Sequence, residues 1–526
     1  MIRLIVLRVM VPFTVLLLHT SLLAQTDSLV LARELVFHSD FERQLFQRQV
    51  FGKEKLDPLA FLLAADPSSN EESLESARAR FRWMDEVLKK AGVDTRKPEK
   101  KIKEIYTLVH RAFLKQYQLE NRMPDVFRNG DYNCVTASAL YALVLQDRMI
   151  PYTIKEKPTH VFLVAYPNSN NILIETTSPL FGYLSFDNTY KSTFVNNLKG
   201  QKLISASEME NKTVDELFNK YYFRDEDIDI RKLIGIHYMN DALFKQDHND
   251  DMKAFQQAEK AWLFYPSERA AYILRMLAGN IMAANKLAPT QRAIMLGKAS
   301  RYQAQGITPA MIEGEFAGLT QTLLIEQDKK AVYKICFDTL QAIVRDTALQ
   351  HRLAFLYNYE NGRILYNQGN YMASRKYVAN AMSIQPNNAD LITMMTIVLG
   401  QSMRNSRDYN AIADTLSSYL KRFPSLARND NFNNMFLSTT LTKCYDAFEK
   451  GKEKLGLDTM AEFEKEMHNN PALSPPTDLV ASTYGKAVSY YFKKGQLNRA
   501  KEILNKGLEW APDNQELKMR LIMMKK

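Results

Sequence analysis

Cys134 is the residue of this 526-residue sequence whose type and setting best suit chemistry. It follows Asn133, a residue that favours the N-cap of a helix, and it begins a largely apolar run that ends near Gln146. The sequence therefore predicts that Cys134 lies in the first turn of a buried helix. Free backbone N–H groups and the positive end of the helix dipole favour a thiolate there, and a thiolate is a nucleophile.

Two β-rich segments follow and supply a histidine and a carboxylate. The first contains His160 and the second ends near Glu175, with a turn-forming Pro-Asn-Ser-Asn cluster at 167–170 between them. If the loop consists of those four residues, Phe162 pairs with Glu175, and His160 and Glu175 become diagonal neighbours on one face of a hairpin. A five-residue loop would place them on opposite faces.

The order of a helix-start cysteine, a strand histidine and an acidic residue followed by Thr-Thr-Ser-Pro resembles the transglutaminase-like branch of the papain-type fold. The resemblance is specific over 130–179 and weaker over 72–231. It implies an α+β domain in which Cys134 is the nucleophile, His160 the base and Glu175 the counterpart of the family's usual aspartate. The sequence departs from the family in having Glu for Asp and no Trp after His160.

The chemistry that this resemblance implies is acyl transfer. His160 would take the proton of Cys134, Glu175 would orient the imidazole, and the thiolate would attack an amide carbonyl to give a thioester. The backbone N–H of Cys134 could donate to the oxyanion, and the side chain of Asn133 is a second candidate donor, although capping is its commoner use. Water as acceptor gives a peptidase or amidase, an amine gives a cross-linking enzyme, and the sequence leaves both open.

Two amphipathic helices are expected before the cysteine, over 72–92 and 98–118, because apolar residues recur there at three- and four-residue spacing. The other cysteines, Cys336 and Cys444, lie in apolar helical contexts, which predicts buried thiols in the core. Three cysteines in a chain of this length exclude a disulfide framework.

Helix-turn-helix units that end in proline recur in the second half of the chain, with the period of about 34 residues typical of tetratricopeptide (TPR) repeats. The clearest unit spans 355–388. A second runs from Tyr484 to Pro512, with Gly507 where alanine is usual, and a third spans 239–266, with Asn249 where a glycine is expected. Such arrays form concave surfaces that commonly bind proteins or peptides.

Residues 1–24 are typical of a secretory signal peptide, with Arg3 and Arg8 near the start of an apolar stretch. We expect cleavage near Ala24 and an exported protein, periplasmic or secreted. No cysteine ends the signal, so a lipid anchor is not expected. The later sequence contains no second candidate for a membrane span.

The formal net charge of +10 is spread along the chain, whereas a nucleic-acid partner calls for a basic stripe interleaved with exposed aromatic residues. We therefore expect no nucleic acid among its partners. The sequence contains no HExxH metal motif, no phosphate-binding loop and no GxSxG elbow, so neither a metal nor a cofactor is expected.

The sequence thus predicts a signal peptide (1–24), an α+β papain/transglutaminase-like domain (25–235, core about 100–205) and an all-α TPR solenoid (236–526). The favoured function is acyl transfer or amide hydrolysis on a protein or peptide recruited by the solenoid. The alternative is a non-catalytic TPR scaffold with a degenerate recognition domain. An enzyme requires its cysteine, histidine and carboxylate to meet at an accessible place, whereas a scaffold can bury or separate them. The oligomeric state is not indicated.

Overall fold

The chain forms two compact units, one of residues 1–287 with 301–307 and one of residues 288–300 with 308–526. The predicted signal peptide lies outside the described residues. The computed structural model describes residues 29–157, 160–167, 169–177, 183–184, 188–200, 204, 208, 211–222, 226–284, 286–406, 408–469 and 474–524.

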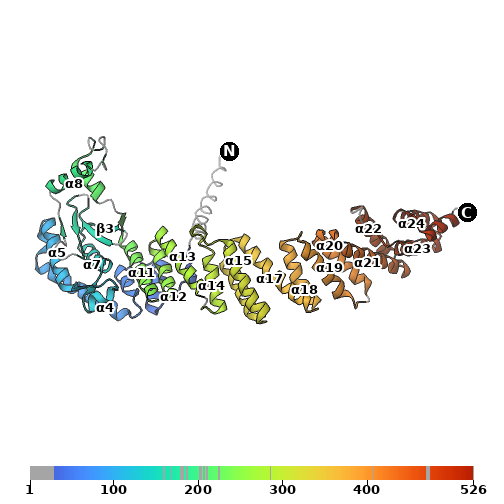
Figure 1. The fold of residues 1–526 in the computed structure, drawn as a ribbon, viewed down its shortest axis with the longest axis horizontal. Helices are drawn as coiled ribbons and strands as arrows, with labels where there is room; N and C mark the ends of the chain where they lie inside the picture. Colours follow the sequence, from blue (N-terminus) through green and yellow to red (C-terminus); the bar gives the residue numbers. More distant parts are fainter. Residues whose placement is uncertain are drawn as a thin grey trace, which may run out of the picture. The chain divides into compact units, whose positions relative to one another are not determined.

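Helices occupy most of the first part of unit one, as Figure 1 shows. The helix predicted over 72–92 is present as α4. In chain order these helices are η1 (Ala32–Glu34), α2 (Asp40–Leu45), η2 (Phe46–Val50), α3 (Pro58–Ala64), α4 (Glu71–Lys90), η3 (Val93–Thr95), α5 (Pro98–Phe113), α6 (Met123–Arg128) and α7 (Cys134–Asp147).

The helix predicted over 98–118 is present as α5, but its predicted end is wrong, because α5 ends at Phe113. Leu114 has extended backbone angles, and the N–H of Lys115 donates to the carbonyl of Gly130 at 2.8 Å instead of continuing the helix. Gln116–Tyr117 then form the short strand β1, which pairs in parallel with β2 (Asp131–Tyr132). A segment immediately before Cys134 is thereby held against the end of α5.

A five-stranded antiparallel sheet follows, in the order β6-β5-β4-β3-β7. Ala165 of β4 pairs with Ile172 of β5, and the N–H of Asn171 donates to the carbonyl of Tyr166 at 3.1 Å. Four residues, 167–170, therefore connect the pair Tyr166 and Asn171, and the predicted register is confirmed. The strands of this sheet are β3 (Tyr152–Lys157), β4 (His160–Ala165), β5 (Ile172–Ile174), β6 (Tyr183–Leu184) and β7 (Glu226–Ile228).

Helices pack against this sheet and bury its apolar side chains. α7 packs on β3 and β4. Helices α8 (Asn188–Gly200) and α10 (Val214–Tyr222) cover one face, where Phe162, Val164 and Leu173 form a buried cluster with side chains of both helices.

Unit one ends with helices α11 (Ile230–Asp247), α12 (Asp251–Phe264) and α13 (Glu268–Ala283) and the short turn η4 (Gln303–Gln305). The boundary expected at 235/236 falls inside α11, which packs on α3 and α7. The turn between α11 and α12 has Asn249 in the left-handed conformation, with φ of 61°, so asparagine does there what glycine does in other repeats.

Unit two is built from helices joined by short turns over its described residues (Figure 1). They are α14 (Pro289–Ala299), α15 (Pro309–Leu319), η5 (Thr320–Glu326), α16 (Lys330–Ile343), α17 (Thr347–Asn367), α18 (Tyr371–Ile384), α19 (Ala389–Met403), α20 (Tyr409–Arg422), η6 (Pro424–Arg428), α21 (Asp430–Glu449), α22 (Glu453–Asn469), α23 (Thr477–Lys493), α24 (Leu497–Trp510) and α25 (Gln515–Met523).

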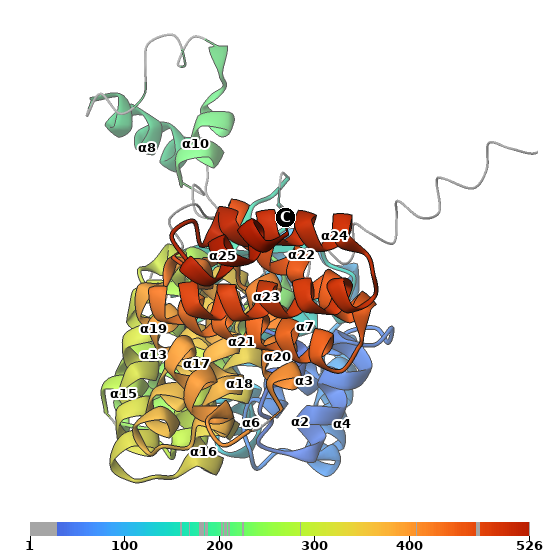
Figure 2. The same cartoon turned by 90° about the vertical axis from the view of Figure 1, so that its right-hand side faces the viewer.

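The repeat near the C-terminus is the hairpin of α23 and α24, which lie side by side in Figure 2. Gly495 makes its turn with φ of 70°. A Cβ atom on Gly507 would lie 2.8 Å from Cβ of Tyr484, which explains why glycine replaces the alanine usual at this position. The earlier hairpin, α17 and α18, has the same design with Gly369 at φ of 73°. No helix within the described ranges is long and apolar enough to cross a membrane.

Candidate active site

Cys134 is the first residue of α7, so the prediction that it lies in the first turn of this helix is confirmed. Asn133 caps the helix: its Oδ1 accepts hydrogen bonds from the N–H groups of Val135 and Thr136, each at 3.0 Å. The Thr136 hydroxyl in turn accepts from the Asn133 N–H at 2.9 Å. The thiol is half-buried, and no group in the described part of the chain accepts a hydrogen bond from the Cys134 N–H.

The side chain of Asn133 is fully occupied by the fold. Its Nδ2 donates to the carbonyls of Leu119 at 3.1 Å and Asn121 at 3.3 Å, and the residue is only 2% exposed. Both amide hydrogens and the amide oxygen are therefore used locally. In this structure Asn133 has no donor left for a substrate oxyanion, because capping α7 and fixing the preceding loop consume all of them.

His160 and Glu175 form a direct pair. His160 is the first residue of β4, and Glu175 follows the last residue of β5. Nε2 of the imidazole lies 3.0 and 2.9 Å from the two carboxylate oxygens of Glu175. The side chains are 27% and 23% exposed, so the pair is sheltered but reachable from solvent.

Glu175 is held in place by the threonine that follows it in the motif. Thr177 donates from its N–H at 3.2 Å and from its hydroxyl at 2.9 Å to Oε1 of Glu175. Burial opposes ionisation of this carboxyl, but the hydrogen bond from His160, the charge of that imidazole and the Thr177 donors together lower its pKa. Glu175 is therefore ionised at neutral pH and stabilises a protonated imidazole.

Cys134 is the third member of the arrangement. Its interaction with the imidazole is the largest cause of a rise in the pKa of His160 to about 9, and the hydrogen bond to Glu175 is the second, against the opposing effect of burial. Since Nε2 faces Glu175, Nδ1 is the ring atom left for the thiol. At neutral pH the imidazole is therefore protonated.

A second set of contacts fixes α7 against the strands. Ser138, one turn after Cys134 on the same face of the helix, donates from its hydroxyl to the carbonyl of Val161 at 3.2 Å. Its Oγ also lies 3.4 Å from Oγ1 of Thr176, which is fully buried. The helix that carries the thiol is thus attached to the neighbours of both His160 and Glu175.

Sequence reasoning missed Tyr117, which β1 places beside the start of α7. The segment 114–118 was expected to be helical because it was included in the predicted amphipathic helix over 98–118. The phenol lies close enough to Cys134 for the thiolate's charge to add to the effect of burial, and both raise the pKa of Tyr117.

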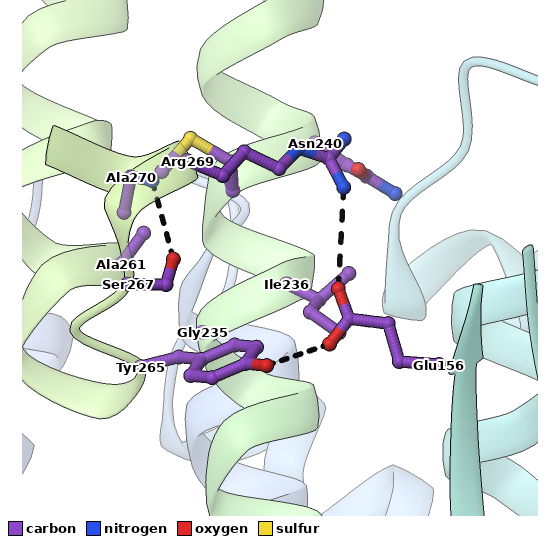
Figure 3. Close-up of a pocket in the computed structure, with 10 residues that line it drawn as sticks. Glu156, Gly235, Ile236, Asn240, Ala261, Tyr265, Ser267, Arg269 and Ala270 are labelled. Atoms are coloured by element: carbon purple, nitrogen blue, oxygen red, sulfur yellow. Dashed lines mark hydrogen bonds and ion pairs between the residues drawn. The ribbon is translucent and has the colours of Figure 1, made fainter. Parts of the chain in front are cut away.

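A separate pocket lies where β3 meets α11, α12 and α13 (Figure 3). Glu156 reaches into it and accepts a hydrogen bond from the Tyr265 hydroxyl at 2.8 Å, with Arg269 as an ion-pair partner at 3.9 Å. Gly235 lets Tyr265 approach, because a Cβ atom there would lie 2.6 Å from Cβ of Tyr265. Ser267, which also lines the pocket, caps α13 by accepting a hydrogen bond from the N–H of Ala270 at 3.2 Å. The polar groups of this pocket thus cap a helix and join the sheet to the helices.

Across the part of the chain that the structure describes, no group of three His, Cys, Asp or Glu side chains is arranged to hold a metal ion. The tetratricopeptide-repeat family model matches residues 481–514, which confirms the repeat predicted near the C-terminus. A search of the curated proteins finds no significant match.

Proposed function

We propose that this protein is a cysteine-dependent acyl-transfer or amide-hydrolysing enzyme of the transglutaminase-like type, with Cys134, His160 and Glu175 as its catalytic residues. The observation that carries the proposal is the solvent-accessible His160–Glu175 pair, whose imidazole also interacts with the Cys134 thiol at the start of α7. A cysteine kept only for packing does not need a paired imidazole, and a surface histidine does not need an oriented carboxylate.

In the proposed reaction the Cys134 thiolate adds to an amide carbonyl while His160 carries the proton. The sulfur–carbon bond forms as the carbonyl π bond breaks, and the electron pair moves onto oxygen. When the intermediate collapses, the carbon–nitrogen bond breaks and His160 gives its proton to the leaving amine. The thioester is then released by water, which makes the protein a peptidase or amidase, or by an amine, which makes it a cross-linking enzyme.

The TPR hairpins supply the recruiting part of the proposal. The matched repeat at 481–514 and the hairpin of α17 and α18 are of a kind that binds proteins and peptides. The proposed substrate is therefore itself a protein or peptide. Residues 25–235 form the catalytic domain of this proposal and 236–526 the recruiting domain.

The proposed site of action is outside the cytoplasm, in the periplasm or the medium. Support for it comes from the charged, apolar and small-residue order of residues 1–24. Fractionation and N-terminal sequencing of the protein produced in a bacterial host test this part: a mature N-terminus near Gln25 in the exported fraction is expected, and an intact Met1 in the cytosol would contradict it.

The chemistry is tested by the rate at which iodoacetamide alkylates Cys134 at different pH values, in the intact protein and in His160→Ala. We expect fast alkylation that persists well below the usual thiol pKa of about 8.5. We expect the His160→Ala variant to lose that low-pH reactivity, by about 100-fold at pH 6, because the imidazolium no longer accompanies the thiolate.

Slow alkylation that does not depend on His160 would refute the catalytic proposal. The TPR hairpins would then favour the scaffold function, in which the first unit recognises a partner without turning it over. A matched control is His248→Ala. His248 also lies 3.1 Å from a carboxylate, that of Glu120, but no cysteine is among the partners that the described residues give it. That variant should leave the alkylation profile unchanged.

A further inference from the structure

Tyr117 is held beside the nucleophile by backbone pairing. In the parallel pair of β1 and β2 it stands opposite Tyr132, two residues before Cys134. The N–H of Gln118 donates to the carbonyl of Tyr132 at 2.8 Å, which locks this register. The side chain of Tyr117 is therefore fixed relative to the start of α7.

The ring of Tyr117 packs against the protein on one side and is exposed to solvent on the other. It packs edge-on against Tyr132, with ring centroids 5.9 Å apart and an interplanar angle of 89°. Tyr132 is 3% exposed, whereas Tyr117 is 46% exposed. After Tyr117, the carbonyls of Leu119 and Asn121 accept hydrogen bonds from Asn133, so the segment that follows the ring is tied to the helix cap.

Two hydrogen-bond donors near the start of α7 have no acceptor within the described residues: the backbone N–H of Cys134 and the hydroxyl of Tyr117. The Tyr117 phenol is close enough to Cys134 to respond to its charge. An oxyanion that forms on the carbonyl attacked by Cys134 needs two donors at about 2.7 to 3.1 Å. Asn133 cannot be one of them, because both hydrogens of its amide are used.

We infer that the Tyr117 hydroxyl is the side-chain donor to the oxyanion, acting together with the Cys134 N–H. This inference rests on the proposed function, since it concerns the same acyl-transfer site. The phenol donates a hydrogen bond and keeps its proton: the negative charge appears on the carbonyl oxygen as the sulfur–carbon bond forms and returns to the carbonyl when the leaving group departs. Tyr117 would therefore be a catalytic residue that acts on the substrate rather than on the thiol.

Two reagents that consume the same thiol separate these roles. p-Nitrophenyl acetate acylates Cys134 through an oxyanion and releases p-nitrophenolate. Iodoacetamide alkylates it by displacing iodide, with no charge on a carbonyl oxygen. Both rates are measured on the full chain, with the Cys134→Ser variant subtracted to remove reaction elsewhere.

For Tyr117→Phe we expect acylation to fall by about 100-fold, the usual cost of removing one oxyanion donor. Alkylation should change by less than about twofold, because the ring and its packing on Tyr132 remain and no oxyanion forms. Retained alkylation also shows that the variant is folded at the site. Tyr272→Phe, at an exposed tyrosine of α13 that is 58% accessible, is the matched control and should change neither rate.

Two outcomes would overturn the inference. If acylation is unchanged in Tyr117→Phe, the hydroxyl does not bind the oxyanion. If acylation and alkylation fall together, Tyr117 acts on the thiolate instead. Failure of the proposed function is a different result, because it appears as slow, His160-independent alkylation in the unmodified protein before any tyrosine is changed.

Discussion

Cys134 and Cys444 are both free thiols on helices, but they differ in exposure and in the groups around them. Cys134 begins α7, is half-buried and has a protonated imidazole beside it. Cys444 lies inside α21, well past its first turn, is 1% exposed and donates to the carbonyl of Gly456 at 3.4 Å. Burial raises the pKa of Cys444 to about 12.

The difference shows that position along a helix decides what a cysteine can do. In the first turn, free N–H groups face the sulfur and a partner from another element can reach it. In the middle of a helix, neighbouring turns and the next repeat enclose the sulfur, and it behaves as a small apolar side chain. Cys336, fully buried in α16, follows the second pattern, and burial raises its pKa as well.

The largest expected difference between the two cysteines is in the rate of thiol alkylation in the native protein. At pH 7 a thiol with a pKa of about 12 is a thiolate in only about one molecule in 10⁵. We expect iodoacetamide to modify Cys134 more than about 100-fold faster than Cys336 or Cys444. Peptide mapping by mass spectrometry after short exposures measures the three rates.

The same mapping in a denaturant is the control, because unfolding should bring the three rates within a few-fold of one another. Equal labelling of Cys134 and Cys444 in the native protein would remove the distinction between the two regions and with it the support for an activated thiol.

A smaller effect tests how tightly the repeat around Cys444 is packed. Gly507→Ala places a methyl group 2.8 Å from Cβ of Tyr484, a side chain that belongs to the same buried cluster as Cys444. We expect it to lower the free energy of unfolding by about 1 to 3 kcal/mol, measured by urea denaturation, because Tyr484 is fully buried and has little room to move.

The matched control is Gly314→Ala in α15, where an added Cβ meets no atom within 4 Å. That change should raise the free energy of unfolding by up to about 1 kcal/mol through helix propensity alone. If Gly507→Ala raises the free energy of unfolding as much as Gly314→Ala does, the repeat is loosely packed, and tight packing around Tyr484 is not what keeps Cys444 buried.

Local sequence signals predicted the parts of the site that depend on local structure. Asn133 identified the start of α7, and the Pro-Asn-Ser-Asn turn fixed the four-residue loop that brings His160 and Glu175 to one face. Tyr117 was missed because the end of α5 is set by a hydrogen bond to Gly130, 15 residues after Lys115 in the numbering, and nothing near Phe113 signals it.

Ion pairs between residues far apart in the chain are a second kind of contact that the sequence patterns did not predict. Nε of Arg122 lies 2.6 Å from Oδ1 of Asp241, and Nζ of Lys260 lies 2.8 Å from Oε2 of Glu42. These pairs, of which Lys260–Glu42 is fully buried, join the first TPR-like hairpin to the segments around α2 and α6. The helical pattern of α11 and α12 is the same whether the hairpin packs on a neighbouring repeat or on these segments, so periodicity alone cannot place it.

The smallest expected effect is that of replacing the Glu175 carboxylate. Below a pH of about 9 His160 carries its proton, and as the pH rises through 9 the imidazolium is lost together with its interaction with the thiolate. Glu175 raises the pKa of His160, so Glu175→Gln should move this loss to lower pH and slow alkylation of Cys134 at neutral pH by about fivefold.

The titration can be followed by NMR on histidine-labelled protein, with the His160 signal identified by its absence in His160→Ala. Cys134→Ser should lower the His160 midpoint more than Glu175→Gln does, because the interaction with the thiol is the larger cause of the raised pKa of His160. Glu156→Gln, which removes a carboxylate of the same sheet that is bonded to Tyr265, should leave the midpoint unchanged. A midpoint near 6.5 in the unmodified protein would show that His160 is not coupled to Cys134, and the two cysteine regions would then differ in exposure but not in chemistry.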